Sequence, residues 1–209
     1  MQQSVLIIAN HVFDDLEFLQ QQLQKFNTVI CCDGAANDMK KINFIPTLII
    51  GDLDSLSSES RDFFQDKVEI IHKPSQYQCD LEKALDYCVD KGYKNVNLIG
   101  LEGGRADYAI ANFIVLKHYC EQLNLKVIGK DYLAFPVIDH WQKKCEAGQI
   151  LSFIPFGHCE GINLKGLKYA LENTSMKLGD IGVSNEVTQE DVRISIKSGY
   201  ACVFLFNKK

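Results

Sequence analysis

The sequence predicts an α/β protein: an N-terminal, mainly parallel sheet covered by helices on both faces, followed by a smaller C-terminal antiparallel β-sandwich. Up to about residue 129, short apolar runs alternate with amphipathic segments of helical period, a pattern typical of crossover units in a parallel sheet. From residue 130 onward, apolar runs alternate with glycine-rich turns and no convincing helix, a pattern typical of an antiparallel sandwich or barrel. We therefore expect two domains, at residues 1–129 and 130–209.

Five runs rich in β-branched residues predict the strands of the first domain. In order they are SVLIIA (4–9), NTVICC (27–32), PTLIIG (46–51), VEIIH (68–72) and NVNLIG (95–100). Three amphipathic segments predict helices because their apolar residues recur at helical spacing. These are DDLEFLQQQLQKF (14–26), DLEKALDYCVDKG (80–92) and DYAIANFIVLKHYCEQLN (107–124). An aspartate is expected to cap the first helix, and Gly92 is a natural residue to end the second.

The second domain contains five strand-like runs separated by turn residues. They are YLAFPVI (132–138), QILSFIPF (149–156), GINLKGLKYAL (161–171), DVRISIKSG (191–199) and YACVFLFN (200–207). The hydrophobic pattern changes its period near residue 130, and no Pro/Ser-rich linker marks the boundary. We therefore place the domain boundary from this change of pattern alone.

The composition limits the classes of function. A hydrophobic fraction of 46% with 23% charged residues is ordinary for a soluble protein with a core. The net charge of −5 disfavours general nucleic-acid binding, which needs a basic surface. The first apolar run is too short for a signal peptide or a membrane span, and the eight cysteines form no C-x-x-C pair. We therefore expect a cytoplasmic protein with reduced cysteines that binds neither nucleic acid nor membrane.

Four loops at the carboxyl ends of predicted strands carry the candidate site. They are CDGAAN (32–37), GDLDS (51–55), SQYQCD (75–80) and GLEGGRAD (100–107). In an open parallel sheet, ligands bind beyond the carboxyl ends of the strands, so these loops are expected to meet. The sequence has no G-x-x-x-x-G-K-[ST] or G-x-G-x-x-G loop and no H-E-x-x-H, which disfavours a P-loop NTPase, a Rossmann dehydrogenase and a zinc protease.

The GDLDS loop is the most informative of the four. In extended backbone, Asp52 and Asp54 would point to the same side with Cα atoms about 6–7 Å apart. Two carboxylates about 6 Å apart repel by roughly 3 kcal/mol at an effective dielectric near 20. A divalent cation such as Mg²⁺ offsets that repulsion, and Mg²⁺ bound to one or two carboxylates and substrate phosphates is usual in phosphoryl-transfer sites. A solvated turn, in which Asp52 caps the following helix and Asp54 is exposed, explains the pair equally well.

The companion loops supply further candidates. The glycines at 103–104 would let the backbone approach a ligand, and Arg105 could hold phosphate oxygens in a bidentate fork. Asp107 could cap the next helix, complete a metal site, or do both. Asp80 and Lys83 are three residues apart at a helix start and could face one site, although a capping aspartate and a surface lysine have the same spacing. The CDGAAN turn, with its small residues, is a weak nucleotide signal by itself.

Taken in order, these motifs resemble the thiamine pyrophosphokinases, the enzymes that make thiamine diphosphate from thiamine and ATP. The matching segments are CDGAAN, PTLIIGDLDS, DLEKAL, GGRADYxxAN, GLKYxL (166–171) and GxSNE (182–186). The resemblance implies a homodimer with active sites at the subunit interface. The first domain would bind magnesium and ATP, and the second would supply part of the thiamine pocket.

The resemblance also implies roles for individual residues. Magnesium would be bound by Asp52 and Asp54, with Asp80 and Asp107 completing the acidic cluster. Phosphate oxygens would be held by Arg105 and Lys83. The nucleotide and neighbouring ligand groups would contact Asp33, Gly34, Asn37, Ser55 and Gln76. Thiamine would stack on Tyr169 and accept hydrogen bonds from, or donate them to, Ser184 and Asn185. The base that takes the thiamine hydroxyl proton would be Asp80 or Asp107.

Two departures from the family pattern leave other functions open. The family often has Thr-Asp or Thr-Asn-Asp before the helix that starts at Asp80, whereas Gln78 and Cys79 stand here; bacterial relatives commonly have His where Tyr108 stands. One alternative is therefore a non-catalytic sensor of nucleotide or thiamine. Another is a diphosphokinase that acts on a different alcohol.

Overall fold

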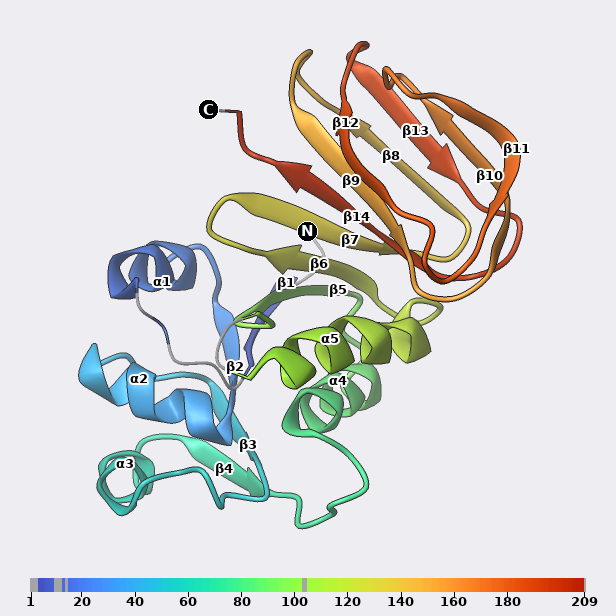
Figure 1. Ribbon diagram of the computed structural model, residues 1–209. Coiled ribbons are helices and arrows are strands. Elements are labelled where there is room, and N and C mark those ends of the chain that lie inside the picture. Colours follow the sequence, from blue (N-terminus) through green and yellow to red (C-terminus); the bar gives the residue numbers. More distant parts are fainter. Residues whose placement is uncertain (1–3, 10–12, 14, 103–104, 209) are drawn as a thin grey trace. The chain divides into compact units, whose positions relative to one another are not determined.

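The computed structural model describes residues 4–9, 13, 15–102 and 105–208 (Figure 1). The chain divides into two compact units, which we call the first and the second unit. The first contains residues up to Val115 together with Glu121–Val127, and the second contains Leu116–Cys120 and the chain from Ile128 onward. The observed division lies close to residue 130, while the predicted roles of the two domains stay predictions.

The first unit is built on a parallel sheet with the strand order β6-β5-β1-β2-β3-β4. Its strands are β1 Ser4–Ile8, β2 Thr28–Cys32, β3 Leu48–Gly51, β4 Glu69–His72, β5 Asn95–Ile99 and β6 Asn124–Ile128. The five strands predicted here are confirmed. The sixth, β6, was not predicted, and only its first residue, Asn124, lay in the predicted helix. The strand order reverses at β1, which has β2 on one side and β5 on the other, as at the switch point of doubly wound sheets.

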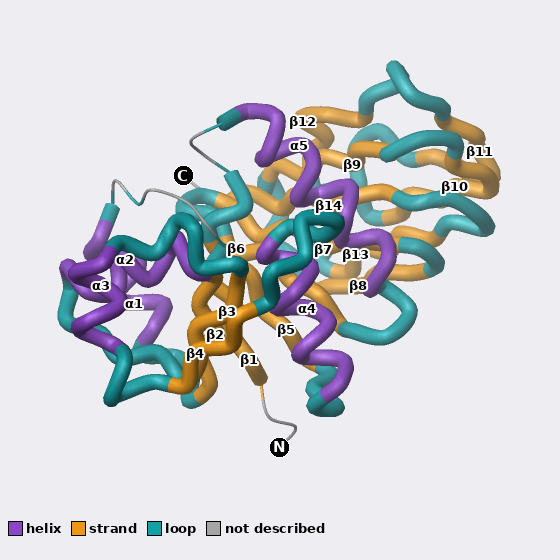
Figure 2. The backbone as a smooth tube through the Cα atoms, turned by 90° about the horizontal axis from the view of Figure 1, so that it is seen from below, coloured by secondary structure: helices purple, strands orange, loops and turns teal. Residues whose placement is uncertain are grey.

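Helices cover both faces of this sheet, with α1, α2 and α3 on one side and α4 and α5 on the other (Figure 2). Their bounds are α1 Leu16–Leu23, α2 Ala36–Lys41, α3 Ser58–Phe64, α4 Asp80–Asp90 and α5 Ala106–Val115, with 3₁₀ turns η1 Asp33–Ala35 and η2 Leu116–Tyr119. The α1 face encloses a core in which Leu6, Ile8 and Ile49 of the strands pack against Leu19 and Phe64 of the helices.

The helix ends follow local rules. The side chain of Asp15 accepts a hydrogen bond from the Phe18 amide and caps α1. Gly92 has φ +74° just beyond α4, which confirms its predicted position at the helix end. The helix predicted to reach residue 124 ends earlier, at Val115. There it passes into η2, whose buried Leu116 and Tyr119 are spaced at the 3₁₀ period of three.

The second unit is an antiparallel β-sandwich. Strands β12, β9, β14 and β7 are neighbours in one sheet, and β11, β10, β13 and β8 form the other. Their bounds are β7 Tyr132–Val137, β8 His140–Lys144, β9 Ile150–Pro155, β10 Cys159–Lys165, β11 Leu171–Met176, β12 Gly182–Glu186, β13 Asp191–Ser195 and β14 Ala201–Phe206. Phe153 and Val203 of one sheet share a core with Ile162, Leu164 and Val192 of the other. The predicted sandwich is confirmed.

No helix within the described ranges combines the length and the apolar character needed to cross a bilayer.

Candidate active site

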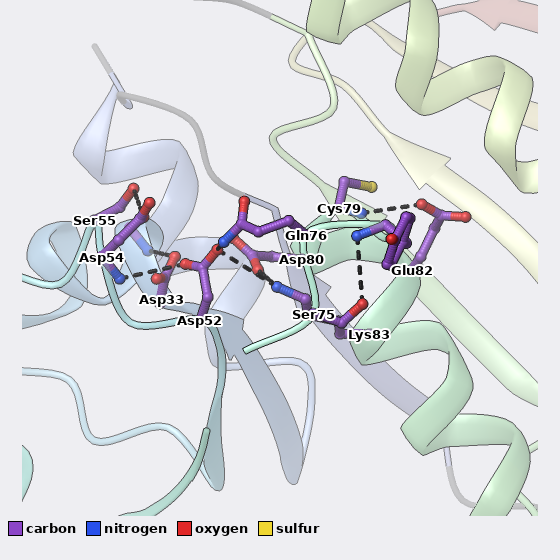
Figure 3. A network of polar contacts seen from close by, with 12 residues as sticks. Asp33, Asp52, Asp54, Ser55, Ser75, Gln76, Cys79, Asp80, Glu82 and Lys83 are labelled. Carbon is purple, nitrogen blue, oxygen red and sulfur yellow. Dashed lines mark hydrogen bonds and ion pairs between the residues drawn. The ribbon is translucent and has the colours of Figure 1, made fainter. Parts of the chain in front are cut away.

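Three aspartates meet at the carboxyl edge of the parallel sheet. Asp33 follows β2, Asp52 follows β3, and Asp80 begins α4 after β4. Parallel strands end at the same edge of the sheet, so residues far apart in sequence come together there. One carboxylate oxygen of each aspartate lies within 4.8 Å of one from each of the others (Figure 3). The predicted meeting of these loops is therefore observed for Asp52 and Asp80, and Asp33 joins them.

Asp33 is the most deeply buried member of the cluster, with no exposed surface. Its Oδ1 accepts a hydrogen bond from the Gly34 amide at 2.5 Å, while its Oδ2 is buried with no hydrogen-bond partner. Burial, and next the neighbouring carboxylate of Asp80, raise the pKa of Asp33 to about 6, and the Gly34 amide only partly opposes this. Asp33 is thus a buried carboxyl whose Oδ2 makes no hydrogen bond.

Gly51, the last residue of β3, makes the space that Asp33 occupies. A Cβ atom at Gly51 would lie 2.8 Å from the Cγ of Asp33, well inside van der Waals contact. The glycine between the apolar run of β3 and Asp52 is therefore required by the close approach of two loops.

The pKa of Asp52 is shifted in the opposite direction from that of Asp33. Partial burial raises the pKa of Asp52. The carboxylate accepts hydrogen bonds from the Asp54 amide at 3.3 Å and from the Gln76 side-chain amide at 2.8 Å. These bonds and the charge of Lys83 outweigh burial, so the pKa of Asp52 is lowered overall. Asp52 is therefore ionised at neutral pH. Gln76, predicted to contact a ligand, here donates to a member of the cluster.

Lys83 brings a buried positive charge to the three carboxylates. Its side chain is 2% exposed, and its Nζ lies 2.9 Å from Oδ1 of Asp80 and 3.7 Å from Oδ2 of Asp52. Burial lowers the pKa of Lys83, but the hydrogen bond and charge of Asp80, and next the charge of Asp52, raise it above its ordinary value. The cluster therefore combines three acids with one permanent cation, which leaves it net negative when all three aspartates are ionised.

Asp54 lies beside the cluster but outside it, because the backbone between the two aspartates is not extended. Leu53 has φ +67°, a left-handed conformation that turns the chain. As a result the Asp54 amide points at Oδ1 of Asp52, and the Asp54 carboxylate accepts a hydrogen bond from the Ser55 hydroxyl at 2.9 Å. The expectation of an extended backbone between Asp52 and Asp54 is wrong, while a metal-binding role for Asp54 stays a prediction.

The alternative in which Asp52 caps the next helix is also wrong. The N-cap of α3 is Ser57, whose Oγ accepts a hydrogen bond from the Ser60 amide at 3.2 Å.

Arg105 and Asp107 pair with each other at the start of α5. The guanidinium makes a bidentate contact with the carboxylate, with Nε–Oδ1 at 3.1 Å and Nη2–Oδ2 at 2.6 Å, and it also lies 4.7 Å from the centre of the Tyr108 ring. Both charged side chains are exposed. Asp107 occupies the first turn of α5 and not its N-cap, and it is not among the three grouped carboxylates. The glycines at 103 and 104 lie outside the described residues.

Asn37 ties the two acidic loops together. Its side-chain amide nitrogen donates to the carbonyl oxygens of Gly34 and Ser55 at 3.0 and 2.9 Å, and its Oδ1 accepts from the Ser57 amide at 3.1 Å. This fixes the loop after β2 against the loop after β3. Asn37 thus holds the cluster in shape, and the predicted nucleotide contacts of Gly34, Asn37 and Ser55 stay predictions.

The residues that depart from the family pattern make structural contacts. Gln78 donates from its side chain to Asp86 at 2.7 Å, and the Cys79 amide donates to the Glu82 carboxylate at 3.0 Å at the start of α4. Both contacts organise the first turns of the helix that carries Asp80 and Lys83.

The three residues predicted to contact thiamine lie together in the second unit. Tyr169, between β10 and β11, is 64% exposed, whereas Asn185 on β12 is buried. The Asn185 side chain accepts from the Tyr169 amide at 2.9 Å and donates to the Tyr169 carbonyl at 2.8 Å. Ser184 has φ +57°, and its amide donates to the Ser152 hydroxyl at 3.1 Å. Asn185 thereby fixes the backbone that presents the exposed Tyr169 ring.

Sequence reasoning missed two members of the site. Asp33 was predicted as a nucleotide contact and not as a member of the carboxylate group, and Gly51 was not singled out. The sequence contained a signal for each residue. Asp33 directly follows an apolar run predicted to be a strand, and Gly51 lies between another such run and Asp52.

Comparison with known proteins identifies the family. Residues 19–128 match the model of the thiamin pyrophosphokinase catalytic domain, and residues 140–201 match the model of the thiamin pyrophosphokinase vitamin B1 binding domain. The thiamine pyrophosphokinase of Bacillus subtilis is 30% identical over 162 residues, covering 74% of this chain and 76% of that protein. Thiamine pyrophosphokinase 1 of rice is 28% identical over 200 residues, covering 81% and 75%.

Solved structures show the same fold. The crystal structure of the Bacillus subtilis thiamine pyrophosphokinase superposes with a TM-score of 0.84 at 23% identity, covering 99% of this chain and all of that one. The yeast thiamin pyrophosphokinase superposes with a TM-score of 0.81 at 19% identity, covering 98% and 86%. Since its family matches span most of both units, this chain belongs to the thiamin pyrophosphokinase family.

Proposed function

We propose that this protein is a thiamine pyrophosphokinase, which transfers the pyrophosphoryl group of ATP to the hydroxyl of thiamine and releases thiamine diphosphate and AMP. The observation that carries the proposal is the cluster of Asp33, Asp52 and Asp80 at the carboxyl edge of the parallel sheet, in a chain of this family. The thiamine hydroxyl would attack the β-phosphorus, the bond from that phosphorus to the α-phosphate oxygen would break, and AMP would leave.

The cluster suits magnesium. Mg²⁺ prefers oxygen ligands, and three carboxylate oxygens within 4.8 Å of one another offer such ligands. The Oδ2 of Asp33 is buried without a hydrogen-bond partner, so it is available to a cation. We propose that Asp33, Asp52 and Asp80 hold the ion, with Asp54 and Asp107 as further ligands. A bound Mg²⁺ would neutralise charge on the phosphate oxygens during transfer.

The chain's own residues would position and balance charge. Lys83 pairs with the carboxylates of Asp80 and Asp52, and so holds α4 against the loop after β3. Arg105 is exposed, so its fork can exchange the Asp107 carboxylate for phosphate oxygens of ATP. Asp107, whose pKa the Arg105 hydrogen bond lowers, would then be free to accept the proton of the thiamine hydroxyl, a role for which Asp80 is the other candidate.

Tyr169 would provide the stacking surface for thiamine, since its ring is exposed and its backbone is fixed by Asn185. We further propose that the active protein is a homodimer with active sites at the subunit interface. A cytoplasmic location is supported by the eight cysteines, all of which are free thiols.

The test is AMP release from ATP with and without thiamine, in magnesium and in EDTA. The proposal predicts release that requires both thiamine and magnesium and that falls at least a hundredfold in Asp52→Asn. Thermal stabilisation by thiamine and ATP without AMP release would instead indicate a non-catalytic sensor. Faster release with another alcohol than with thiamine, at fixed ATP and magnesium, would indicate a different diphosphokinase.

A further inference from the structure

The second unit carries a basic cavity on one face of the sheet formed by β11, β10, β13 and β8. Trp141, Ile194 and Leu164 are paired across β8, β13 and β10, and they pack on the sandwich core. The residues beside them in each strand point to the opposite, outer face, because side chains alternate along a strand. A cavity of about 410 Å³ lies there, and none of the residues that line it is acidic.

The strand register arranges the outer side chains in two parallel rows. One row is His140, Ser195 and Asn163, and the other is Gln142, Arg193 and Lys165. With strands about 4.8 Å apart and alternate residues about 7 Å apart, the six side chains cover roughly 10 by 7 Å. This is the size of a phosphate or diphosphate group, and every residue in the two rows carries a hydrogen-bond donor.

Asn163 and Ser195 form the rigid part of this cavity. The Asn163 side chain donates to Gly161 at 3.1 Å and to Ser195 Oγ at 3.2 Å, and it accepts from the Asn173 amide at 3.0 Å. Asn163 is therefore held at both ends of its amide. Because the Ser195 oxygen already accepts from Asn163, the hydroxyl hydrogen is left to donate into the cavity.

The two cations of the cavity are available to a ligand. Within the described part of the chain, Lys165 has no ion-pair partner, and Arg193 has only a loose contact of 3.6 Å with the exposed Asp191. Such exposed pairs contribute little, so an anion can displace this one. His140 pairs through Nδ1 with Asp139 at 2.9 Å, and both side chains are exposed.

The same charges disfavour a second copy of the chain on this face. A symmetric contact would bring Lys165 and Arg193 of one copy near the same residues of the other, and like charges repel. A small anion has no such penalty, and a planar guanidinium with a nearby ammonium is suited to phosphoryl oxygens.

We propose that this cavity is a second anion site, distinct from the carboxylate cluster, which binds the phosphate or diphosphate group of a small molecule through Lys165, Arg193 and Ser195. The ligand class is a phosphate or diphosphate ester or the free anion. The binding needs no magnesium and no contact with the residues proposed for catalysis.

The experiment is a titration of the full-length protein, followed by two-dimensional amide NMR, in EDTA. Without a divalent ion the three aspartates of the cluster repel anions, so binding in the second unit is observed separately. Inorganic diphosphate is expected to shift amide signals of β8, β10 and β13. The double variant Lys165→Gln, Arg193→Gln is expected to bind about tenfold more weakly or worse, because two charge-assisted contacts are lost.

The matched control is Lys91→Gln, Lys94→Gln, which removes the same charge from an exposed turn of the first unit. It should bind diphosphate as the wild type does, and both double variants should release AMP at the wild-type rate. Equal weakening in the two double variants, no shifts in the three strands, or equal binding of sulfate and diphosphate would each overturn the proposal. Tighter binding of AMP than of inorganic phosphate would assign the site to an ester, and equal binding to the free anion.

Discussion

Asp33→Asn should make the metal-free protein more stable at neutral pH while it abolishes turnover. The substitution keeps the shape of the side chain and removes its charge. The amide oxygen can still accept the hydrogen bond from Gly34, and the new NH₂ takes the place of the buried Oδ2 that has no partner. The neighbouring Asp80 carboxylate can accept from that NH₂, whereas it now repels a second negative charge.

The magnitude follows from the pKa of Asp33, which is raised from 3.8 to about 6 in the folded protein. Well below pH 3.8 this carboxyl is protonated in both the folded and the unfolded chain. As the pH rises from about 4 to about 6, the unfolded chain ionises first, so the free energy of unfolding falls. At 1.36 kcal/mol per pH unit the total loss is about 3 kcal/mol, and it persists above pH 6.

The assay is urea unfolding of both proteins in EDTA at pH 4.5 and at pH 8. At pH 8 the variant should be more stable by about 1–3 kcal/mol, and at pH 4.5 the difference should fall to about a third of its value at pH 8. Asp52→Asn is the control in the same cluster. Because hydrogen bonds hold the pKa of Asp52 below its ordinary value, that variant should lose stability at pH 8. A destabilised Asp33→Asn, or a difference that does not change with pH, would refute this account of the cluster.

Three further substitutions test how the site is held. Gly51→Ala should destabilise the protein by about 1–3 kcal/mol and reduce AMP release, because the new Cβ would lie 2.8 Å from Asp33 Cγ; urea unfolding and turnover measure both effects. Lys83→Met should cost roughly 3 kcal/mol or more in urea unfolding at pH 8, since it leaves Asp80 without its cation, and unchanged stability would contradict the pairing. Asn185→Ala should raise the KM for thiamine more than it lowers kcat, because Tyr169 loses two backbone contacts; an unchanged KM would show that Tyr169 needs no such support.

The parts of the fold that sequence could predict are those in which a buried face dictates residue type. The strands SVLIIA and NTVICC are buried along their length, and both were predicted. Strands β8 (HWQKK), β11 (LENTSM) and β12 (GVSNE) were not singled out, because they expose polar side chains and lack an apolar run. Their place in the sandwich is decided by pairing with β13, β10 and β9, which is information about distant parts of the chain.

The candidate site also has a part that the sequence could predict and a part that it could not. The position of Asp52 and Asp80 at one sheet edge could be predicted, since parallel strands end together. The geometry within the loops could not, because it depends on single backbone angles. A left-handed Leu53 replaces the expected extended backbone and aims the Asp54 amide at Asp52, and the missing Cβ of Gly51 leaves room for Asp33.

Unfavourable backbone dihedral angles are found at the two candidate ligand sites. Among the described residues, four that are not glycine have positive φ: Asn43, Leu53, Asn173 and Ser184. Asparagine tolerates this conformation, but leucine and serine adopt it at a cost of about 1–2 kcal/mol. The costly pair lies at the two sites proposed for ligands, Leu53 between the acidic residues of the first unit and Ser184 beside Asn185 in the second. Backbone strain at these two positions and the unpartnered oxygen of Asp33 both lower the stability of the fold. We infer that these features are kept because the two segments are shaped for ligand binding.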